Sequence, residues 1–315
     1  MFDADDMGKW LSGEKLPNIE FAYNSETWES LPKEFKDELK KLFERKILTP
    51  AIHATISHAL RNYSIEFVRK IVEEEHLGKL VYAGGDDVLA FVNLRDLFSV
   101  MRKLRSSFSG NIRIENGEIK VDWNNKTGFV EKDDRLILTM GPNAIISGGV
   151  VIAHYKTPLK IALDKVREAE KIAKDEKGKD SFAIWLLKHS GEDRIAKSKW
   201  RYENFDVLEK LTELEEFFQK KEKEPWISKS FIYNLSNEFQ RLKKEDGYFL
   251  GSFAIFQTEL KRLIVRASHG NEKERENMIG SILESLIAIF SNIGSNINNF
   301  VNLLLITALV SVAEE

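Results

Sequence analysis

Two acidic clusters are the residues of this chain best suited to chemistry. They comprise Asp3, Asp5 and Asp6 near the start of the chain, and Asp86 and Asp87 further along it. Carboxylates held side by side repel one another, so they need water or a cation between them. Hard oxygen ligands on a short turn suit Mg²⁺ or Mn²⁺, which keep coordination positions for water and for phosphate oxygens. The clusters therefore predict a divalent-metal site for a substrate that carries phosphates.

The second cluster lies at the tip of an expected β-hairpin. Apolar strands are predicted over 79–83 and 88–92, and Gly84 and Gly85 precede the two aspartates. Glycine tolerates a positive φ and leaves room for a nucleotide above the tip. A solvated β-turn is the alternative interpretation of any such pair of aspartates. The first cluster follows the start of another strand, and it favours the metal site if that strand lies beside the hairpin in an antiparallel sheet.

Helical and strand-like segments alternate through about the first 200 residues and must position these clusters. Helices are predicted over 31–47, 51–76, 93–108 and 158–178, and single strands over 144–155 and, as the last strand, 181–189. Asn116-Gly117 predicts a further hairpin within 110–125. Gly78 is expected to cap the helix before it. Residues 12–30 and 126–135 are expected to form polar loops.

Strand signals stop near residue 200. Helices are predicted over 203–220, 227–244, 251–268 and 278–313. We therefore predict an α+β domain at 1–202 that carries the aspartates, followed by an all-α helical bundle at 203–315.

Composition excludes several classes of site. The chain has 315 residues, 47 basic and 50 acidic side chains, a net charge of −3 and no cysteine, so disulfides and cysteine-bound zinc or iron–sulfur sites are excluded. The acidic N-terminus lacks a signal peptide, and the apolar tail is too short for a membrane span. We expect a cytoplasmic protein without membrane contact, and the excess of Lys and Glu favours a thermophile.

Three blocks of the sequence resemble a known family. FDADDMGKWL, the segment TPAIHATISHAL to VYAGGDDVLAFV, and ISGGVVIAHYKTPLKIALDKVREAEKIAK are similar to the large subunit of type III CRISPR effector complexes of the Cmr type, the CRISPR polymerase. The likeness covers about residues 1–200. It implies a ferredoxin-like palm, which is a nucleotidyl cyclase-like antiparallel sheet with helices on one face, followed by the helical bundle.

The resemblance also implies an activity and partners. Members of this family use ATP and a divalent metal to make 3′–5′ cyclic oligoadenylates once their complex binds target RNA. Other subunits of the complex, guide RNA and target RNA are the implied partners. The implied catalytic residues are Asp3, Asp86 and Asp87, and the implied metal ligands are these three and the carbonyl of Ala4. The implied nucleotide contacts are Met7, Gly8, Lys9, Gly84, Gly85, Ser147, Gly149 and Lys174.

Two other functions stay open at this point. The chain could be a catalytically silent scaffold or nucleotide-binding subunit of the same complex, or a diguanylate cyclase-like enzyme, although GGDD replaces the GGDEF of those enzymes. The family's upstream HD nuclease region, first palm and cysteine-bearing zinc module have no counterpart here, so we expect a C-terminal piece of a longer or engineered protein. Basic runs such as KSKWRY (197–202) are candidates for RNA contact or for solvated faces.

Overall fold

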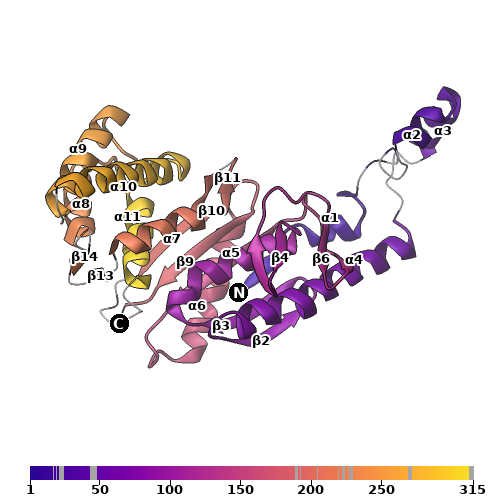
Figure 1. The fold of residues 1–315 in the computed structure, drawn as a ribbon, viewed down its shortest axis with the longest axis horizontal. Helices are drawn as coiled ribbons and strands as arrows, with labels where there is room; N and C mark the ends of the chain where they lie inside the picture. The colour runs from indigo at the N-terminus through magenta and orange to yellow at the C-terminus, as the bar shows by residue number, and fades with distance from the viewer. Residues whose placement is uncertain are drawn as a thin grey trace.

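A six-stranded mixed sheet forms the centre of the structure (Figure 1). The computed structural model describes residues 1–311 apart from 17, 19, 21–24, 43–47, 189–190, 192, 204, 219, 222–223, 226, 228–229 and 269–271. The strand order is β10-β9-β8-β1-β3-β2. The strands are β1 (Phe2–Ala4), β2 (Gly78–Gly84), β3 (Asp87–Val92), β8 (Ile146–Ile152), β9 (Ser181–Leu186) and β10 (Arg194–Lys199). All neighbours are antiparallel except β8 and β9, which are parallel.

Helices pack on both faces of this sheet. On one face, α4 (Pro50–Asn62) continues through π-helical turns at Tyr63–Val68 and Lys70–Glu74 and packs with α5 (Leu97–Phe108). On the opposite face, α6 (Leu159–Lys174) packs on β8 and β9. We expected antiparallel strands with helices on one face. Helices lie on both faces because β8 and β9 are parallel. Parallel neighbours need a crossover connection, and α6 supplies it on the second face.

The predicted hairpin at Asn116-Gly117 is confirmed. It joins β4 (Ile112–Glu115) to β5 (Glu118–Val121), and both turn residues have positive φ, 52° and 77°. These angles match the turn that best fits the twist of two antiparallel strands.

A second hairpin replaces the polar loop expected at 126–135. It pairs β6 (Phe129–Lys132) with β7 (Arg135–Leu138) through Asp133-Asp134, whose φ angles are 49° and 58°. Only Val130 and Ile137 of this hairpin are buried. So few inward-facing apolar residues give a weak alternating pattern, which explains why the sequence suggested a loop.

The connections before β2 also differ from expectation. Two short helices, α1 (Met7–Leu11) and α2 (Ser25–Ser30), precede α3 (Lys33–Leu42), and Figure 1 shows α2 and α3 away from the sheet. Residues 43–47 of the predicted helix lie outside the described residues. Gly78 is not a helix cap but the first residue of β2, where an added Cβ would lie 2.6 Å from the Val72 carbonyl oxygen.

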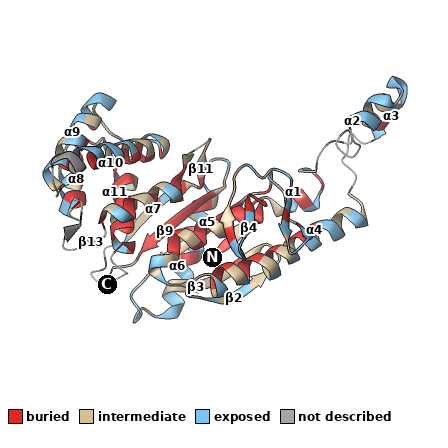
Figure 2. Ribbon diagram, viewed as in Figure 1, coloured by how far each residue is buried: buried red, intermediate tan, exposed pale blue. Residues whose placement is uncertain are grey.

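Residues 197–202, considered above for RNA contact, belong largely to the sheet. The last strand of the six-stranded sheet is β10 rather than the segment at 181–189, and Trp200 directly after β10 is only 2% exposed. The Trp200 ring stacks on Phe2 at 5.5 Å. This aromatic side chain is therefore part of the core. Figure 2 shows the burial along β9, all of whose residues are buried.

The C-terminal part is helical, as predicted. Short strand pairs β11 (Arg201–Tyr202) with β12 (Phe205–Asp206) and β13 (Lys220–Lys221) with β14 (Glu224–Pro225) accompany α7 (Val207–Phe218), α8 (Ser230–Gln240), α9 (Phe253–Ala267), α10 (Glu272–Asn292) and α11 (Ile297–Val310). The single helix expected over 278–313 is two helices, because Gly294 and Ser295 take φ of 82° and 59°. No helix among the described residues is long and apolar enough to cross a bilayer. The domain boundary at 202/203 stays a prediction.

Helix α11 covers the outer edge of the sheet with asparagine side chains. The Asn299 side chain accepts a hydrogen bond from the Lys197 amide and donates one to the Lys197 carbonyl oxygen, both at 2.8 Å. Asn302 donates to the Ile195 carbonyl oxygen, also at 2.8 Å. These amides thus take the place of a further strand beside β10 and satisfy backbone groups that an edge strand otherwise leaves open.

A turn of unusual backbone geometry follows β1. Asp6 has φ of 59°, and the neighbouring turn at Gly178–Asp180 has three consecutive positive φ angles. The Asp6 carboxylate pairs with Lys15 at 2.9 Å and with Lys179 at 2.8 Å, which joins the two turns. Hydrogen bonds from Lys179 and then from Lys15 lower the pKa of Asp6 to about 2.

We expect Asn299→Ala to lower the free energy of unfolding by about 1–2 kcal/mol, because it leaves both backbone groups of Lys197 without these partners. Amide hydrogen exchange at Lys197 should accelerate about tenfold. The matched control is Asn298→Ala on the same helix, since the exposed Asn298 contacts only the Lys243 ammonium, at 3.3 Å, among the hydrogen bonds of the described residues. Equal exchange at Lys197 in the two variants would contradict the proposed edge pairing.

We expect Asp6→Asn to cost about 2 kcal/mol of stability at pH 7, because the folded-state pKa lies below the unfolded one. That contribution is complete above about pH 4 and is lost as pH falls through 2, so the difference from the parent chain should halve by about pH 3. Urea unfolding at pH 7, 4 and 3 measures it. Asp133→Asn, at another aspartate with positive φ (49°), should show no comparable pH-dependent loss. A pH-independent cost for Asp6→Asn would point to backbone strain instead.

Candidate functional site

Asp3 and Asp87 lie opposite each other on adjacent strands. The register of β1 and β3 pairs Asp3 with Asp87, and the Ala4 amide donates a hydrogen bond to the Asp86 carbonyl oxygen at 3.2 Å. Directly opposed residues of antiparallel strands project to the same face. The structure therefore brings the first strand and the aspartate hairpin together, as the sequence predicted.

The hairpin tip is a two-residue turn at Gly85-Asp86, flanked by the pair Gly84 and Asp87. Only Gly85 has a positive φ, of 68°, and an added Cβ there would meet nothing within 4 Å. Gly84 instead lies in the strand, where an added Cβ would fall 2.2 Å from the Tyr82 hydroxyl oxygen. The open space expected above the tip is thus present at Gly85, whereas the Tyr82 ring covers Gly84.

The other two aspartates of the first cluster do not join Asp3 and Asp87. Asp6 pairs with two lysines, as described above, and Asp5 is only 1% exposed. The Asp5 carboxylate accepts hydrogen bonds through Oδ2 from the Ser147 hydroxyl at 2.7 Å and from the Asp180 amide at 3.1 Å. Burial raises the pKa of Asp5, and its Oδ1 atom has no hydrogen-bond partner among the described residues. The expectation that both acidic clusters converge is therefore correct only for Asp3.

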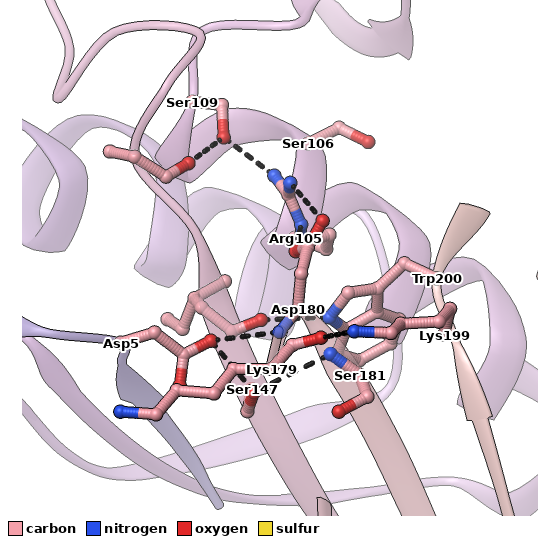
Figure 3. Close-up of polar contacts among 12 residues, drawn as sticks. Asp5, Arg105, Ser106, Ser109, Ser147, Lys179, Asp180, Ser181, Lys199 and Trp200 are labelled. Atoms are coloured by element: carbon pink, nitrogen blue, oxygen red, sulfur yellow. Dashed lines mark hydrogen bonds and ion pairs between the residues drawn. The ribbon is translucent and has the colours of Figure 1, made fainter. Parts of the chain in front are cut away.

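A buried polar network fixes the turn that carries Asp5 (Figure 3). Arg105 of α5 binds both carboxylate oxygens of Asp180, with its Nε at 2.5 Å and an Nη atom at 3.0 Å. Arg105 also donates to Ser109, whose hydroxyl donates to the Ala144 carbonyl oxygen. Asp180 thereby presents its amide to Asp5. Sequence reasoning did not predict this network, because its members come from segments that lie far apart in the chain.

Ser147 and Gly149 make structural contacts, and their expected role as nucleotide contacts stays a prediction. Ser147 is fully buried, and its hydroxyl is committed to Asp5. An added Cβ at Gly149 would lie 2.3 Å from the Glu170 backbone nitrogen of α6. The small residues of this strand therefore allow α6 to approach the sheet closely. These contacts favour a role in tight packing between the strand and α6.

Lys174, predicted to lie near phosphates, contacts the carboxylate of Asp3. Its ammonium group also lies 2.9 Å from Oε1 of Glu170, one helical turn earlier on α6. Glu170 is 7% exposed, and its pKa is raised by burial first and then by the charges of Asp5 and Asp87. Burial, with a smaller effect from Lys179, lowers the pKa of Lys174 to about 8. Sequence reasoning missed Glu170, although its spacing of four from Lys174 is a recognisable helical ion pair.

The segment Met7 to Lys9 forms most of α1 and follows the Asp5-Asp6 turn directly. Gly8 and Lys9 are exposed, and Met7 packs partly against the core. The Lys9 and Trp10 amides donate to the Asp6 carbonyl oxygen at 2.8 and 3.2 Å. These residues lie at the same end of β1 as Asp3, so their expected role as nucleotide contacts stays a prediction.

An apolar cavity of the described residues lies elsewhere. Its volume is about 450 Å³, and its lining includes Val92 of β3, Ile152 of β8 and His154. Strand β8 meets Asp3 at Ser147, so His154 lies beyond the opposite end of that strand. The cavity therefore does not contain the carboxylate pair.

The donor set fits a divalent metal that shares its coordination with a substrate. Among the described residues, no three His, Cys, Asp or Glu side chains are arranged to hold a metal ion by themselves. Mg²⁺ commonly uses one or two carboxylates together with water and substrate phosphates. The ammonium of Lys174 on Asp3 indicates that this position already attracts positive charge. Asp3 and Asp87, with Asp86 and the Ala4 carbonyl nearby, are the groups that would hold the ion.

Comparison with known proteins places the sequence among CRISPR subunits. Residues 1–183 match the family model of Cas10/Cmr2, second palm domain. The chain is 31% identical over 298 residues to the CRISPR system Cmr subunit Cmr2 of Pyrococcus furiosus. The matched stretch covers 93% of this chain and 29% of that protein. It is 22% identical over 211 residues to the CRISPR system single-strand-specific deoxyribonuclease Cas10/Csm1 (subtype III-A) of Streptococcus thermophilus, which covers 67% of this chain and 23% of that protein.

One solved structure is also similar, a chain of the type III-B Cmr-beta complex in the apo state. The identity is 21% and the TM-score 0.44, over 76% of this chain and 24% of that chain. This likeness is too low to support an argument. The chain spans less than a third of the length of these relatives. Because the family model covers more than half of its 315 residues, the chain belongs to the Cas10/Cmr2 second palm domain family.

Proposed function

We propose that this chain is the nucleotidyltransferase module of a type III CRISPR effector complex. It would bind ATP and Mg²⁺ or Mn²⁺ and would form cyclic oligoadenylate when the complex holds target RNA. The observation that carries the proposal is the register of β1 and β3, which sets Asp3 against Asp87 beside the open Gly85 turn. Family membership supports the same reaction class.

Each group of the site has a role in this proposal. Asp3, Asp86, Asp87 and the Ala4 carbonyl hold the metal. Bound Mg²⁺ or Mn²⁺ would lower the pKa of the attacking 3′-hydroxyl and would neutralise charge on the departing pyrophosphate. Met7, Gly8 and Lys9 accommodate the triphosphate, and Lys174 supplies a positive charge to it. The chain's own contribution is positioning and charge stabilisation, which dominate other phosphoryl transfers.

The partners follow from the relatives. Other subunits of the effector complex, guide RNA and target RNA would contact this chain or the protein that contains it. Ser147 and Gly149 have no role at the nucleotide in this proposal, because they lie beneath α6. A catalytically silent scaffold is the alternative function. The carboxylate pair counts against it, because a chain that only supports the complex would not need these charges.

We expect Asp86→Asn/Asp87→Asn to reduce oligoadenylate formation about a hundredfold or more, because it removes the metal-binding charges of the hairpin. The assay uses the assembled effector complex containing this chain, with target RNA, ATP and Mn²⁺. The matched control is Asp133→Asn/Asp134→Asn, which changes the same two charges at the tip of the β6–β7 hairpin.

The control complex should retain the parent rate. Unchanged product formation by Asp86→Asn/Asp87→Asn would overturn the catalytic assignment. If the unaltered complex binds target RNA but makes no oligoadenylate, the scaffold alternative gains support instead.

A further inference from the structure

The ammonium group of Lys174 occupies a place among the carboxylates that a metal would need. We infer that Lys174 is an internal counterion of Asp3 that a divalent metal displaces, and that Glu170 retains the displaced ammonium beside the site. The inference rests on the proposed function, because it concerns how the same carboxylates exchange one cation for another. It assigns Glu170 a positioning role.

The two acceptors of Lys174 come from different elements, and this makes the exchange possible. Asp3 belongs to β1, whereas Glu170 lies on α6 together with Lys174 and 2.9 Å from its ammonium. Rotation of the lysine side chain is enough to break the contact with Asp3. The contact with Glu170 moves with the helix and need not break. No backbone rearrangement is required for a metal to reach Asp3.

Burial explains why the ammonium stays near the site. The Glu170 side chain is 9% exposed, whereas those of Lys174 and Asp3 are 24% and 25% exposed. A buried carboxylate without a partner carries a large desolvation cost. Glu170 therefore needs Lys174 in both states, and Asp3 can take either cation. After the exchange, Lys174 remains within reach of a phosphate at the same carboxylates.

The surrounding charge favours a divalent ion over the ammonium. The carboxylates of Asp5 and Asp87 act on Glu170 closely enough to raise its pKa. One ammonium offsets a single negative charge of this group, whereas Mg²⁺ or Mn²⁺ offsets two. The lysine thus neutralises the site partly when no metal is bound, and it must be displaced for full neutralisation.

The experiment titrates the full chain with Mn²⁺ at pH 7 and follows free Mn²⁺ by electron paramagnetic resonance. We expect Lys174→Met to bind Mn²⁺ about tenfold more tightly than the parent, because the variant lacks the ammonium that competes for Asp3. A tenfold change corresponds to the loss of about one charge-assisted hydrogen bond. Lys174→Arg keeps a competing charge and should stay near the parent affinity. The control Lys171→Met removes an exposed charge of the same helix and should change affinity about twofold at most.

A thermal-shift series with Mn²⁺ provides a second readout. The variant that binds more tightly should gain more stability at a given Mn²⁺ concentration. The apparent melting temperature without Mn²⁺ shows whether each variant is folded. Should Lys174→Met not fold, Lys174→Gln repeats the same comparison with a shorter polar side chain.

The retaining role of Glu170 is tested by combining changes. Glu170→Gln leaves Asp3 as the remaining carboxylate partner of Lys174, so it should weaken Mn²⁺ binding more in the parent than in the Lys174→Met background. Equal effects in both backgrounds would overturn the role of Glu170.

The outcomes separate this inference from the proposed function. If Mn²⁺ binds in a way that Asp3→Asn abolishes, and Lys174→Met leaves the affinity unchanged or weaker, the counterion role is wrong and the metal site stands. If neither the parent nor Lys174→Met binds Mn²⁺ at Asp3, both proposals are overturned.

Discussion

The close approach of α6 to β8 is the constraint on which the rest of the site depends. Gly149 brings the helix backbone against the strand, so a Cβ at that position would overlap the main chain of Glu170. This contact sets how far Lys174 reaches across the sheet toward Asp3. Helix α6 also connects the parallel strands β8 and β9, and it lies directly on both of them. The absence of a side chain at one residue thus governs where the charged groups meet.

The acidic segment after β1 is divided by the fold into three different environments. Asp3 faces Asp87 and Lys174, Asp5 is buried against Ser147 and the Asp180 amide, and Asp6 lies between two lysines. The left-handed backbone at Asp6 and the burial of Asp5 give different surroundings to side chains that lie close in the sequence. Repulsion among the aspartates is thereby avoided, and one carboxylate is left to meet the hairpin.

Local patterns in the sequence predicted the parts of the fold that depend on nearby residues. The glycine-aspartate hairpin and the Asn116-Gly117 turn both follow from such signals. The meeting of Asp3 with Asp87 required one further assumption, that β1 lies beside β3. The resemblance to a known family supplied that assumption.

The remaining features depend on contacts between distant segments. Ser147 looked like a nucleotide contact because its burial cannot be judged until α6 is placed on β8. The roles of Glu170 and Arg105 were not predicted from the sequence. Each depends on an aspartate from a distant segment, Asp87 near Glu170 and Asp180 bound to Arg105. Strand β10 lacks a clear alternating pattern of apolar residues, because its two buried residues are the small Ala196 and the polar Ser198. These contacts between distant segments form only when the chain is folded.

The asparagines of α11 give the sheet two unlike borders. At β10, the side chains of Asn299 and Asn302 already use main-chain groups that another strand would need. At β2, the other border, no strand follows in the sheet order, and a register shift between Leu80 and Tyr82 interrupts the regular pairing with β3. At the β2 border the chain also uses a main-chain group, because the Leu80 amide donates a hydrogen bond to Oε1 of Glu73 at 3.1 Å. The two borders therefore differ in kind: asparagine amides of a helix meet β10, whereas a carboxylate meets β2.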